Sequence, residues 1–515
     1  MINPSLEQAK KLLTEKRNAA YQRIPLRMEL YADLLTPVMA LRRLKRASQH
    51  CFLLESAEQS EQRGRYSFLG YDPVMEITCR DGLVRITGKE QAETVQTVNP
   101  QAVLRKIMKE NRVPRLKGMP PFSGGLAGYF SYDYIKYSEP SLKLDAKDEA
   151  SFADADLMLF DKVIAFDHYR QKVILIVNIT TQDLDSAYIL GEEKLREMAF
   201  LLIRGEMAEN PPLVLKSRFR YLFDKEKYCE IVEKAKRYIR EGDIFQAVLS
   251  NRIEADMAGS LLDTYRVLRS SNPSPYMFYF TGDEMEIAGA SPETLVKLEN
   301  GILYTFPLAG TRPRGSTPEE DMELERSLLA DEKERAEHNM LVDLGRNDLG
   351  KISKIGTIEV EKYMCVERFS HVMHLGSTVK GCIRGDKDAL DAVDAILPAG
   401  TLSGAPKLRA CEIINELEGH KRGIYGGALG YLDFSGNLDI CIAIRLAFAK
   451  NGKVVIRSGA GIVADSVPEQ EFAECANKAE AVLQALKAAE GGLDVAERYG
   501  GSGEELNYDI ISRQL

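Results

Sequence analysis

At 515 residues the chain is too long for one ordinary hydrophobic core, so two domains or subdomains are expected. A content of 44% hydrophobic and 28% charged residues is typical of a soluble globular protein, and a formal net charge of −9 gives no basic face for nucleic acid. No apolar run approaches the ~20 residues that cross a bilayer, the N-terminus lacks the apolar core of a signal peptide, and the eight cysteines form no CxxC pair. We therefore expect a cytoplasmic protein with no membrane or nucleic-acid partner, no disulfide framework and no zinc site.

Helix and strand patterns follow one another from the N-terminus. The first ~20 residues favour an amphipathic helix. Strand patterns occupy 50–88, with a turn at Asp81-Gly82. A β-hairpin is expected over 156–179 and a helix over 183–207.

The paired prolines Pro211 and Pro212 mark the best candidate for a domain boundary. Beyond them, strands and helices alternate to about residue 488, which fits an α/β (α+β) architecture with large sheets. We predict three parts: an N-terminal domain (1–210), a second domain (211–490) and a polar C-terminal tail (491–515).

Two glycine-containing segments of the second half are candidate anion sites. In TFPLAGTRPRG, Gly310 and Thr311 offer backbone N–H groups and a hydroxyl that can hold a carboxylate or phosphate. The simpler interpretation is a turn that uses glycine and proline for geometry alone. In IRSGAGIVADS, Gly459, Ala460 and Gly461 follow a strand and offer a similar place for an anion.

Two predicted helices each carry a pair of glutamates three residues apart, a spacing that puts both carboxylates on one face. The pairs are Glu334 with Glu337 and Glu471 with Glu474. Mg²⁺ prefers oxygen ligands and takes one or two protein carboxylates, so the two helices could bracket one ion. Each pair alone is more simply a solvated helix face, and Lys478 a salt-bridge partner of Glu474.

Four more polar residues stand in apolar or loop segments. His374 could face a pocket as a proton donor or be a structural histidine. Thr401 precedes a helix, whose N-terminus attracts anions. Tyr425 and Arg445 lie near strand-like runs, and Arg445 in ICIAIRLAF either awaits a ligand carboxylate or forms a buried ion pair with a protein carboxylate. Together these signals describe a pocket for a small di-anion, with one magnesium ion and one arginine.

The same segments closely resemble the signatures of the chorismate-utilising enzymes, in the family's order: PLAGTRPRG, DEKERAEHNMLVDLGRNDLG, LPAGTLSGAPK, RGIYGGALGY and IRSGAGIVADSVPEQEFAE. The resemblance covers roughly 220–488 and, more loosely, 25–170. It implies a two-subdomain fold with extended, mainly antiparallel sheets flanked by helices. It also implies a magnesium-dependent carbon–oxygen lyase of the anthranilate-forming branch, which makes anthranilate and pyruvate from chorismate and ammonia in tryptophan biosynthesis.

The resemblance assigns roles at matching positions. It implies that Glu337 and Glu474 bind Mg²⁺, with Glu334 and Glu471 nearby. The implied chorismate contacts are Gly310, Thr311, Tyr425, Arg445, Gly459, Ala460 and Gly461. The implied catalytic residues are His374, Thr401 and Lys478. Mg²⁺ would hold the ring carboxylate of chorismate, and Arg445 with Tyr425 the enolpyruvyl carboxylate.

Two positions favour the anthranilate branch over its relatives. The aminodeoxychorismate synthases commonly carry a lysine nucleophile where this chain has Ala309, which forms no covalent adduct. Isochorismate and salicylate synthases activate water with a lysine where this chain has Gln246, which is no general base. The alternatives are an aminodeoxychorismate synthase that lacks the lysine, and a catalytically silent tryptophan-sensing subunit, which the retained Glu337 and Glu474 disfavour.

The resemblance also extends to regulation and partners. The segments LLES and NPSPYM are similar to the family's tryptophan site, which implies that Ser56, Pro275, Tyr276 and Met277 surround tryptophan as a feedback inhibitor. Nothing in the sequence resembles a glutamine amidotransferase. A separate glutamine amidotransferase small subunit that supplies ammonia, in a heterotetramer, is therefore implied.

Overall fold

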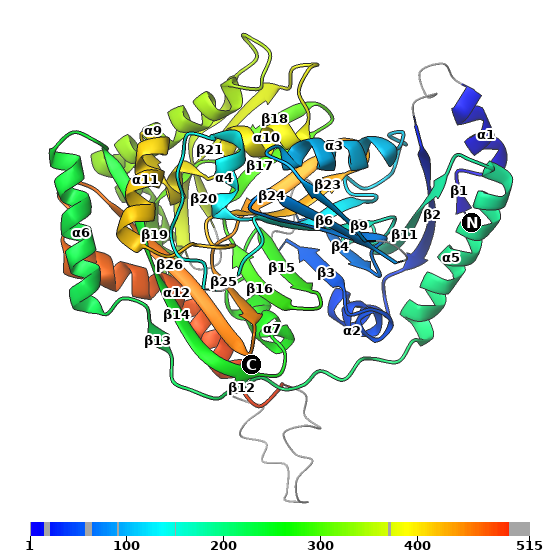
Figure 1. Ribbon diagram of the computed structural model, residues 1–515, viewed down its shortest axis with the longest axis horizontal. Coiled ribbons are helices and arrows are strands. Elements are labelled where there is room, and N and C mark those ends of the chain that lie inside the picture. Colours follow the sequence, from blue (N-terminus) through cyan, green and yellow to red (C-terminus); the bar gives the residue numbers. More distant parts are fainter. Residues whose placement is uncertain are drawn as a thin grey trace, which may run out of the picture.

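The computed structural model describes residues 2–14, 21–56, 64–89, 92–149, 151–368 and 372–493, so most of the predicted tail lies outside the described residues. Within them, two large antiparallel sheets form the centre of the molecule and helices lie on their outer sides (Figure 1). This confirms the predicted α/β (α+β) class with extended antiparallel sheets. Among the described helices, none combines the length and the apolarity needed to span a bilayer.

The first sheet has 14 strands in the described part of the chain. In sheet order they are β1 (Ile2–Asn3), β2 (Arg23–Tyr31), β11 (Lys172–Thr180), β10 (Lys162–Asp167), β4 (Tyr66–Tyr71), β3 (Cys51–Glu55), β15 (Tyr276–Thr281), β16 (Met285–Ser291), β25 (Leu446–Lys450), β26 (Lys453–Ile462), β14 (Gln246–Ala258) and β12 (Val214–Leu215), with β13 (Arg220–Tyr221) and β22 (Gly404–Ala405) beside β14.

The second sheet has 12 strands in the same described ranges. In sheet order they are β19 (Leu308–Pro313), β21 (Val372–Cys382), β18 (Ile302–Thr305), β17 (Thr294–Glu299), β24 (Leu438–Ile442), β23 (Ala428–Asp433), β8 (Gly125–Phe130), β9 (Ala155–Phe160), β5 (Met75–Arg80), β6 (Leu83–Gly88) and β7 (Ala92–Gln96), with β20 (Glu359–Arg368) beside β21.

The helices cover the outer faces of these sheets (Figure 1). They are α1 (Leu6–Thr14), α2 (Pro37–Ala47), α3 (Pro100–Glu110), α4 (Ile135–Ser138), α5 (Leu184–Arg204), α6 (Lys225–Arg240), α7 (Leu262–Ser271), α8 (Pro318–Ala330), α9 (Glu332–Gly350), α10 (Ala389–Ile396), α11 (Lys407–Glu418) and α12 (Pro468–Ala489). The described ranges also contain the short 3₁₀ segments η2 (Tyr132–Tyr134) and η3 (Gly400–Leu402).

An aromatic core lies between the two sheets. Phe52 of β3 in the first sheet meets Phe160 of β9 in the second, with ring centroids 4.9 Å apart. Phe68 of β4 meets Tyr431 of β23 in the same way, at 5.6 Å. Edge-to-face pairs of this kind add about 0.5–1.5 kcal/mol each beyond the burial of their area. The two sheets therefore form one packed unit.

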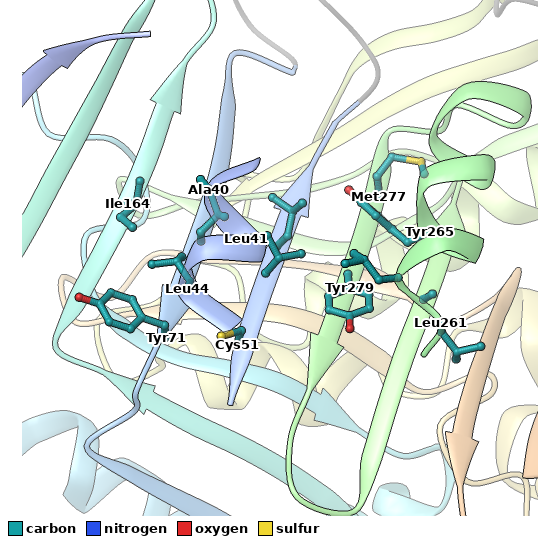
Figure 2. Packing of buried hydrophobic residues seen from close by; sticks show 14 of the residues in the cluster. Ala40, Leu41, Leu44, Cys51, Tyr71, Ile164, Leu261, Tyr265, Met277 and Tyr279 are labelled. Carbon is teal, nitrogen blue, oxygen red and sulfur yellow. The ribbon is translucent and has the colours of Figure 1, made fainter. Parts of the chain in front are cut away.

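A second core lies between the first sheet and the helices outside it. Figure 2 shows Ala40, Leu41 and Leu44 of α2 beside Cys51 of β3 and Tyr71 of β4. The spacing of these α2 residues, three and four apart, places them on one face of the helix. Thr36 caps this helix, accepting a hydrogen bond from the backbone N–H of Met39.

Both sheets take strands from either side of the predicted boundary near residue 210. In the first sheet Glu55 of β3 lies opposite Met277 of β15, and in the second Leu126 of β8 lies opposite Leu432 of β23. The division of the chain into domains 1–210 and 211–490 stays a prediction. In space the two halves interleave.

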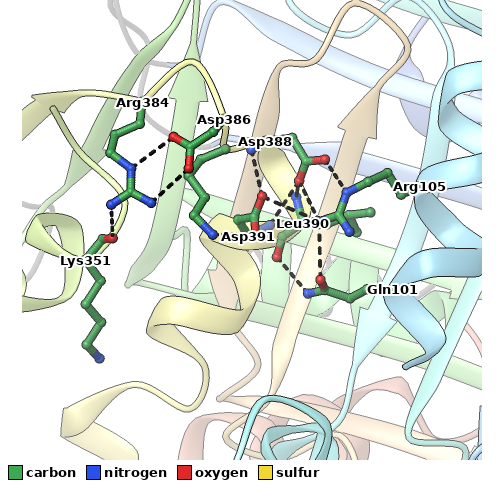
Figure 3. A network of polar contacts seen from close by, with 9 residues as sticks. Gln101, Arg105, Lys351, Arg384, Asp386, Asp388, Leu390 and Asp391 are labelled. Atoms are coloured by element: carbon green, nitrogen blue, oxygen red, sulfur yellow. Dashed lines mark hydrogen bonds and ion pairs between the residues drawn. The ribbon is translucent and has the colours of Figure 1, made fainter. Parts of the chain in front are cut away.

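Polar contacts between two helices also join the halves (Figure 3). Arg105 of α3 donates to both carboxylate oxygens of Asp388, the N-cap of α10, at 2.6 and 3.2 Å. Gln101, one turn earlier in α3, donates to the Leu390 carbonyl at 3.0 Å. Because Asp388 and Asp391 also form a capping box, this N-terminal helix is fastened to the first turn of α10.

Two predicted elements differ from the structure. The helix predicted over the first ~20 residues is described only as α1, after the short strand β1, with 15–20 outside the described residues, and the hairpin over 156–179 is divided between the sheets. The turn at Asp81-Gly82 joins β5 to β6, and both residues have positive φ, 47° and 79°, as a two-residue hairpin turn requires. Within 156–179, β10 and β11 do form a hairpin. The segment Ala155–Phe160 instead pairs with β5 and β8 in the other sheet, so the chain changes sheets at Asp161.

Candidate active site and effector cavity

The first part of the candidate site is a close contact between β19, β21 and α9. His374 of β21 donates from Nδ1 to the Gly310 carbonyl at 2.7 Å, and the Thr311 hydroxyl lies 3.1 Å from the same nitrogen. Gly310 has φ +64°, and a Cβ on it would lie 3.2 Å from Glu334 Oε2 and 2.9 Å from Leu328. Glycine is therefore needed for both its backbone conformation and the close approach of α9.

Burial lowers the pKa of His374, and the nearby charge of Arg445 lowers it further. The hydrogen bond to the Gly310 carbonyl acts in the opposite direction. A carbonyl only accepts, so the Nδ1–H tautomer is the one that this contact selects in the neutral ring. In that tautomer Nε2 carries the lone pair of the neutral ring and can accept a proton.

The glutamates of α9 and α12 influence one another through their charges. Partial burial raises the pKa of Glu337, the negative charges of Glu334 and Glu474 raise it further, and Lys478 opposes them. Burial and Glu474 also raise the pKa of Glu471. Carboxylates of α9 and α12 therefore lie close enough to repel one another, an arrangement that a bound cation relieves.

This donor set fits Mg²⁺, with one restriction. Within the described residues, no three His, Cys, Asp or Glu side chains are grouped closely enough to form a complete metal site. Mg²⁺ does not require such a group, because it usually keeps several waters and takes one or two protein carboxylates together with a substrate oxygen. Glu337 and Glu474 are the residues that would hold it.

Lys478 lies between the carboxylates and the glycine segment. Its Nζ is 2.7 Å from Glu474 and 3.2 Å from the Gly459 carbonyl. The salt-bridge interpretation is therefore correct, and the same ammonium group also reaches the predicted substrate segment.

Arg445 occupies a crossing between the sheets, where the chain passes from β24 to β25. Its φ is +50°, a conformation that few side chains adopt without constraint. Burial lowers the pKa of Arg445, and Glu293 opposes this. In the described part of the chain no carboxylate lies within 4 Å of the Arg445 guanidinium. The close ion pair with a protein carboxylate, which the sequence left open as an alternative, is therefore not observed among the described residues. A largely desolvated charge without a close partner is unfavourable, and a ligand carboxylate would offset this cost.

The sequence analysis missed Glu293, which occupies the neighbouring crossing from β16 to β17. The two crossings are joined, because the Ile442 N–H donates to the Glu293 carbonyl at 2.9 Å. Burial raises the pKa of Glu293 to about 7, against the hydrogen bond from Thr401 (3.0 Å) and the charges of Arg445 and Lys478. Its segment AGASPETLVKL also holds serine, threonine and a lysine, so no lone charge in an apolar run marked Glu293 as it marked Arg445.

Tyr425 and the glycine segment form the floor of the candidate site. Tyr425 is buried, and a Cβ on Gly459 would lie 2.9 Å from its hydroxyl. A Cβ on Gly461 would meet the Gln246 amide at 2.9 Å, while Ala460 between them is fully buried. Because Gly459 and Gly461 have no side chain, the Tyr425 hydroxyl and the Gln246 amide can lie against the backbone of this segment.

The predicted effector residues line a separate cavity of about 780 Å³ between the two sheets. Ser56, Pro275, Tyr276 and Met277 meet there because β3 and β15 are neighbouring antiparallel strands. Tyr276 is anchored through its hydroxyl, which donates to Asp439 of β24 at 2.8 Å. None of the predicted catalytic or chorismate-binding residues lines this cavity, so the structure separates the two predicted sites.

The chain matches the family of chorismate binding enzymes over residues 49–484. It is 45% identical over 497 residues to anthranilate synthase component 1 from Acetivibrio thermocellus, covering 95% of this chain and 99% of that protein. It is 43% identical over 495 residues to anthranilate synthase component 1 from Aquifex aeolicus, covering 95% and 99%.

Solved structures agree with these matches. Anthranilate synthase component I from Streptococcus pneumoniae is 38% identical with a TM-score of 0.70, over 82% of this chain and 93% of that chain. The menaquinone-specific isochorismate synthase from Escherichia coli shares the fold at 21% identity, with a TM-score of 0.66 over 93% and 98%. The chain belongs to the chorismate binding enzymes.

Proposed function

We propose that this chain is the synthase component that converts chorismate and ammonia to anthranilate and pyruvate. The observation that carries the proposal is the meeting of a partly buried acid, Glu293, and an unpaired cation, Arg445, at two joined sheet crossings, near a carboxylate cluster on α9 and α12. Relatives that carry the name anthranilate synthase component 1 match nearly the full chain, which supports this activity over aminodeoxychorismate synthesis.

Chorismate carries two carboxylates, and the site offers one place for each. Arg445 and Tyr425 would bind the enolpyruvyl carboxylate, and the N–H groups of the Gly459–Gly461 segment lie next to Tyr425. The ring carboxylate would face Glu337 and Glu474. When bound between them, Mg²⁺ would supply the positive charge that this carboxylate requires.

Glu293 and His374 would divide the proton transfers. With a pKa near 7, the Glu293 carboxyl is protonated in a large fraction of molecules at neutral pH, and it can protonate the 4-hydroxyl as ammonia adds at ring carbon 2. Thr401 donates to Glu293 and so orients this carboxyl. Neutral His374 can then accept the carbon-2 proton as pyruvate departs and the ring becomes aromatic.

Ala309 and Gln246 support anthranilate as the product. Ala309 lies in β19 next to Gly310 and carries no nucleophile, so ammonia would attack the ring directly. The Gln246 amide lies against Gly461 and does not take a proton from water. The 780 Å³ cavity would bind tryptophan as a feedback inhibitor, and a glutamine amidotransferase small subunit would supply ammonia.

A product assay tests the proposal. The purified chain, chorismate, Mg²⁺ and an ammonium salt should give 2-aminobenzoate fluorescence together with pyruvate, and tryptophan should suppress both. Glutamine should replace ammonium only when an amidotransferase subunit is added. Accumulation of 4-amino-4-deoxychorismate, or of isochorismate without ammonia, would contradict the proposed activity.

A further inference from the structure

Helix α9 carries a buried histidine next to the proposed metal carboxylates. His338 follows Glu337 directly, lies one turn after Glu334, and is fully buried. Its Nε2 lies 2.6 Å from the Ser377 hydroxyl, and its Nδ1 has no hydrogen-bond partner among the described residues. Burying an imidazole with one unsatisfied nitrogen is unfavourable, and an apolar side chain could fill the same space without that cost. Packing alone therefore does not account for the histidine.

Ser377, the partner of this histidine, connects four elements. It lies in β21, and its hydroxyl accepts a hydrogen bond from the Met364 N–H of β20 at 3.0 Å. Its own N–H donates to the Pro307 carbonyl, just before β19, also at 3.0 Å. With the bond to His338 of α9, one serine fixes the mutual position of three strands and the helix that carries Glu334 and Glu337.

Ser377 is also part of the wall of the 780 Å³ cavity, together with its neighbours Gly376 and Thr378. The wall on the first sheet contains the predicted effector residues Ser56 and Tyr276. The Ser377 wall thus faces the effector position on one side and reaches α9 on the other.

Among the described residues, Asn339 of α9 also accepts a hydrogen bond from the exposed Tyr363 of β20, and further polar contacts lie at the two ends of the helix. At the N-terminus Arg312 pairs with Asp331, the N-cap residue, at 2.8 Å. At the C-terminus Lys407 reaches Asp348 at 3.4 Å. Between these ends, the His338–Ser377 contact joins the helix to the cavity wall within one turn of Glu334 and Glu337. One hydrogen bond thus links Ser377 in the cavity wall to the turn of α9 that carries the two carboxylates.

We propose that His338 is a positioning residue that holds the carboxylates of α9 through Ser377 and couples the occupancy of the cavity to divalent-cation binding. The inference rests on the proposed function, because it assigns a cation to Glu337 and Glu474 and an effector to the cavity. By thermodynamic reciprocity, tryptophan should then change the affinity for the cation by the same factor by which the cation changes the affinity for tryptophan.

The test measures Mn²⁺ binding by electron paramagnetic resonance, with and without tryptophan, in the absence of chorismate. In His338→Leu and Ser377→Ala we expect Mn²⁺ affinity to fall about tenfold, as for other residues that orient metal ligands, and the effect of tryptophan on it to disappear. The double variant should be no weaker than either single one, because both break the same contact. In His338→Gln, the amide oxygen can still accept from Ser377 and should preserve most of the affinity.

Thr378→Val is the matched control, because it removes a hydroxyl from the same cavity wall without touching α9. It should leave Mn²⁺ binding and its response to tryptophan unchanged. If His338→Leu does not fold, Ser377→Ala and His338→Gln decide the question. The proposal is overturned if folded Ser377→Ala binds Mn²⁺ with wild-type affinity and responds to tryptophan as the wild type does. It is also overturned if tryptophan does not change the Mn²⁺ affinity of the wild-type chain. Failure of the proposed function would instead appear as absent anthranilate formation.

Discussion

The active-site region and the effector cavity differ in how their charges are satisfied. At the active site Arg445 has no carboxylate within 4 Å in the described chain, and the carboxylates of Glu334, Glu337 and Glu474 repel one another. At the cavity, Glu55 receives hydrogen bonds from Tyr265, Arg269 and Ser67. At the first site Arg445 is left for a charged ligand, although Glu474 is paired with Lys478, whereas at the second site Glu55 is already paired and helps to hold a shaped space. The following changes test this contrast.

The largest effect is expected for Glu474→Gln, which removes one of the two proposed metal carboxylates. Turnover should fall below detection, because an amide is a weaker Mg²⁺ ligand, while melting temperature and circular dichroism stay close to wild type. Glu480→Gln, an exposed acid on the same helix, is the control. Full activity of Glu474→Gln at limiting Mg²⁺ would remove this residue from the metal site.

Arg445→Met is expected to reduce kcat/KM for chorismate by about 10³-fold, within the range for losing one partner of a desolvated charge pair. The folded state should not lose stability, because the guanidinium is half-buried and its burial opposes the charged form. Arg445→Lys keeps the charge but not the planar fork, so its loss should be smaller. Steady-state kinetics and thermal unfolding check this. A strongly lowered melting temperature with unchanged kinetics would make Arg445 a structural residue.

These two predictions concern residues that the sequence identified, and the reason is local. Glutamates three apart on a helix share a face whatever the rest of the fold does, and a lone charge in an apolar run signals a partner from outside the run. Helix bounds followed from the same periodicity, as in α5, predicted over 183–207 and found over Leu184–Arg204. Such features need no knowledge of which strands are neighbours.

The features that the sequence did not predict depend on distant pairings. Only the family resemblance grouped Ser56 with Tyr276, because the strands β3 and β15 that bring them together are far apart in the chain and their register has no local signal. The interleaving of the two halves in both sheets has the same origin. Glu293 was missed because its raised pKa arises from burial at a crossing that only the assembled sheets create.

Glu293→Gln tests that crossing, with an expected loss of about 100-fold in kcat, at the lower end of the range for general acids. Since the protonated carboxyl of Glu293 is the active form, wild-type kcat should fall as pH rises above about 7. The variant should lack this decline. The pKa of Glu293 is raised from 4.5 in the folded state, so its stabilising contribution is complete below pH 4.5 and is lost as pH rises through about 7. The variant should therefore gain in melting temperature relative to wild type across that interval. If the variant also showed this fall of kcat at high pH, the titrating group would be a residue other than Glu293.

Ser56→Phe should change catalysis least and regulation most. Ser56 directly follows β3 at the cavity wall, and a phenyl ring there would occupy space that tryptophan needs without touching any proposed catalytic residue. Anthranilate formation should stay within about twofold of wild type, as for most changes away from a reacting centre, while inhibition by tryptophan is relieved. Ser56→Ala removes the hydroxyl without filling the cavity and should shift inhibition less. If tryptophan inhibited Ser56→Phe and wild type equally, the cavity would not be the effector site. The tryptophan site would then have to lie elsewhere, and its charges would have to be compared with those around Arg445 again.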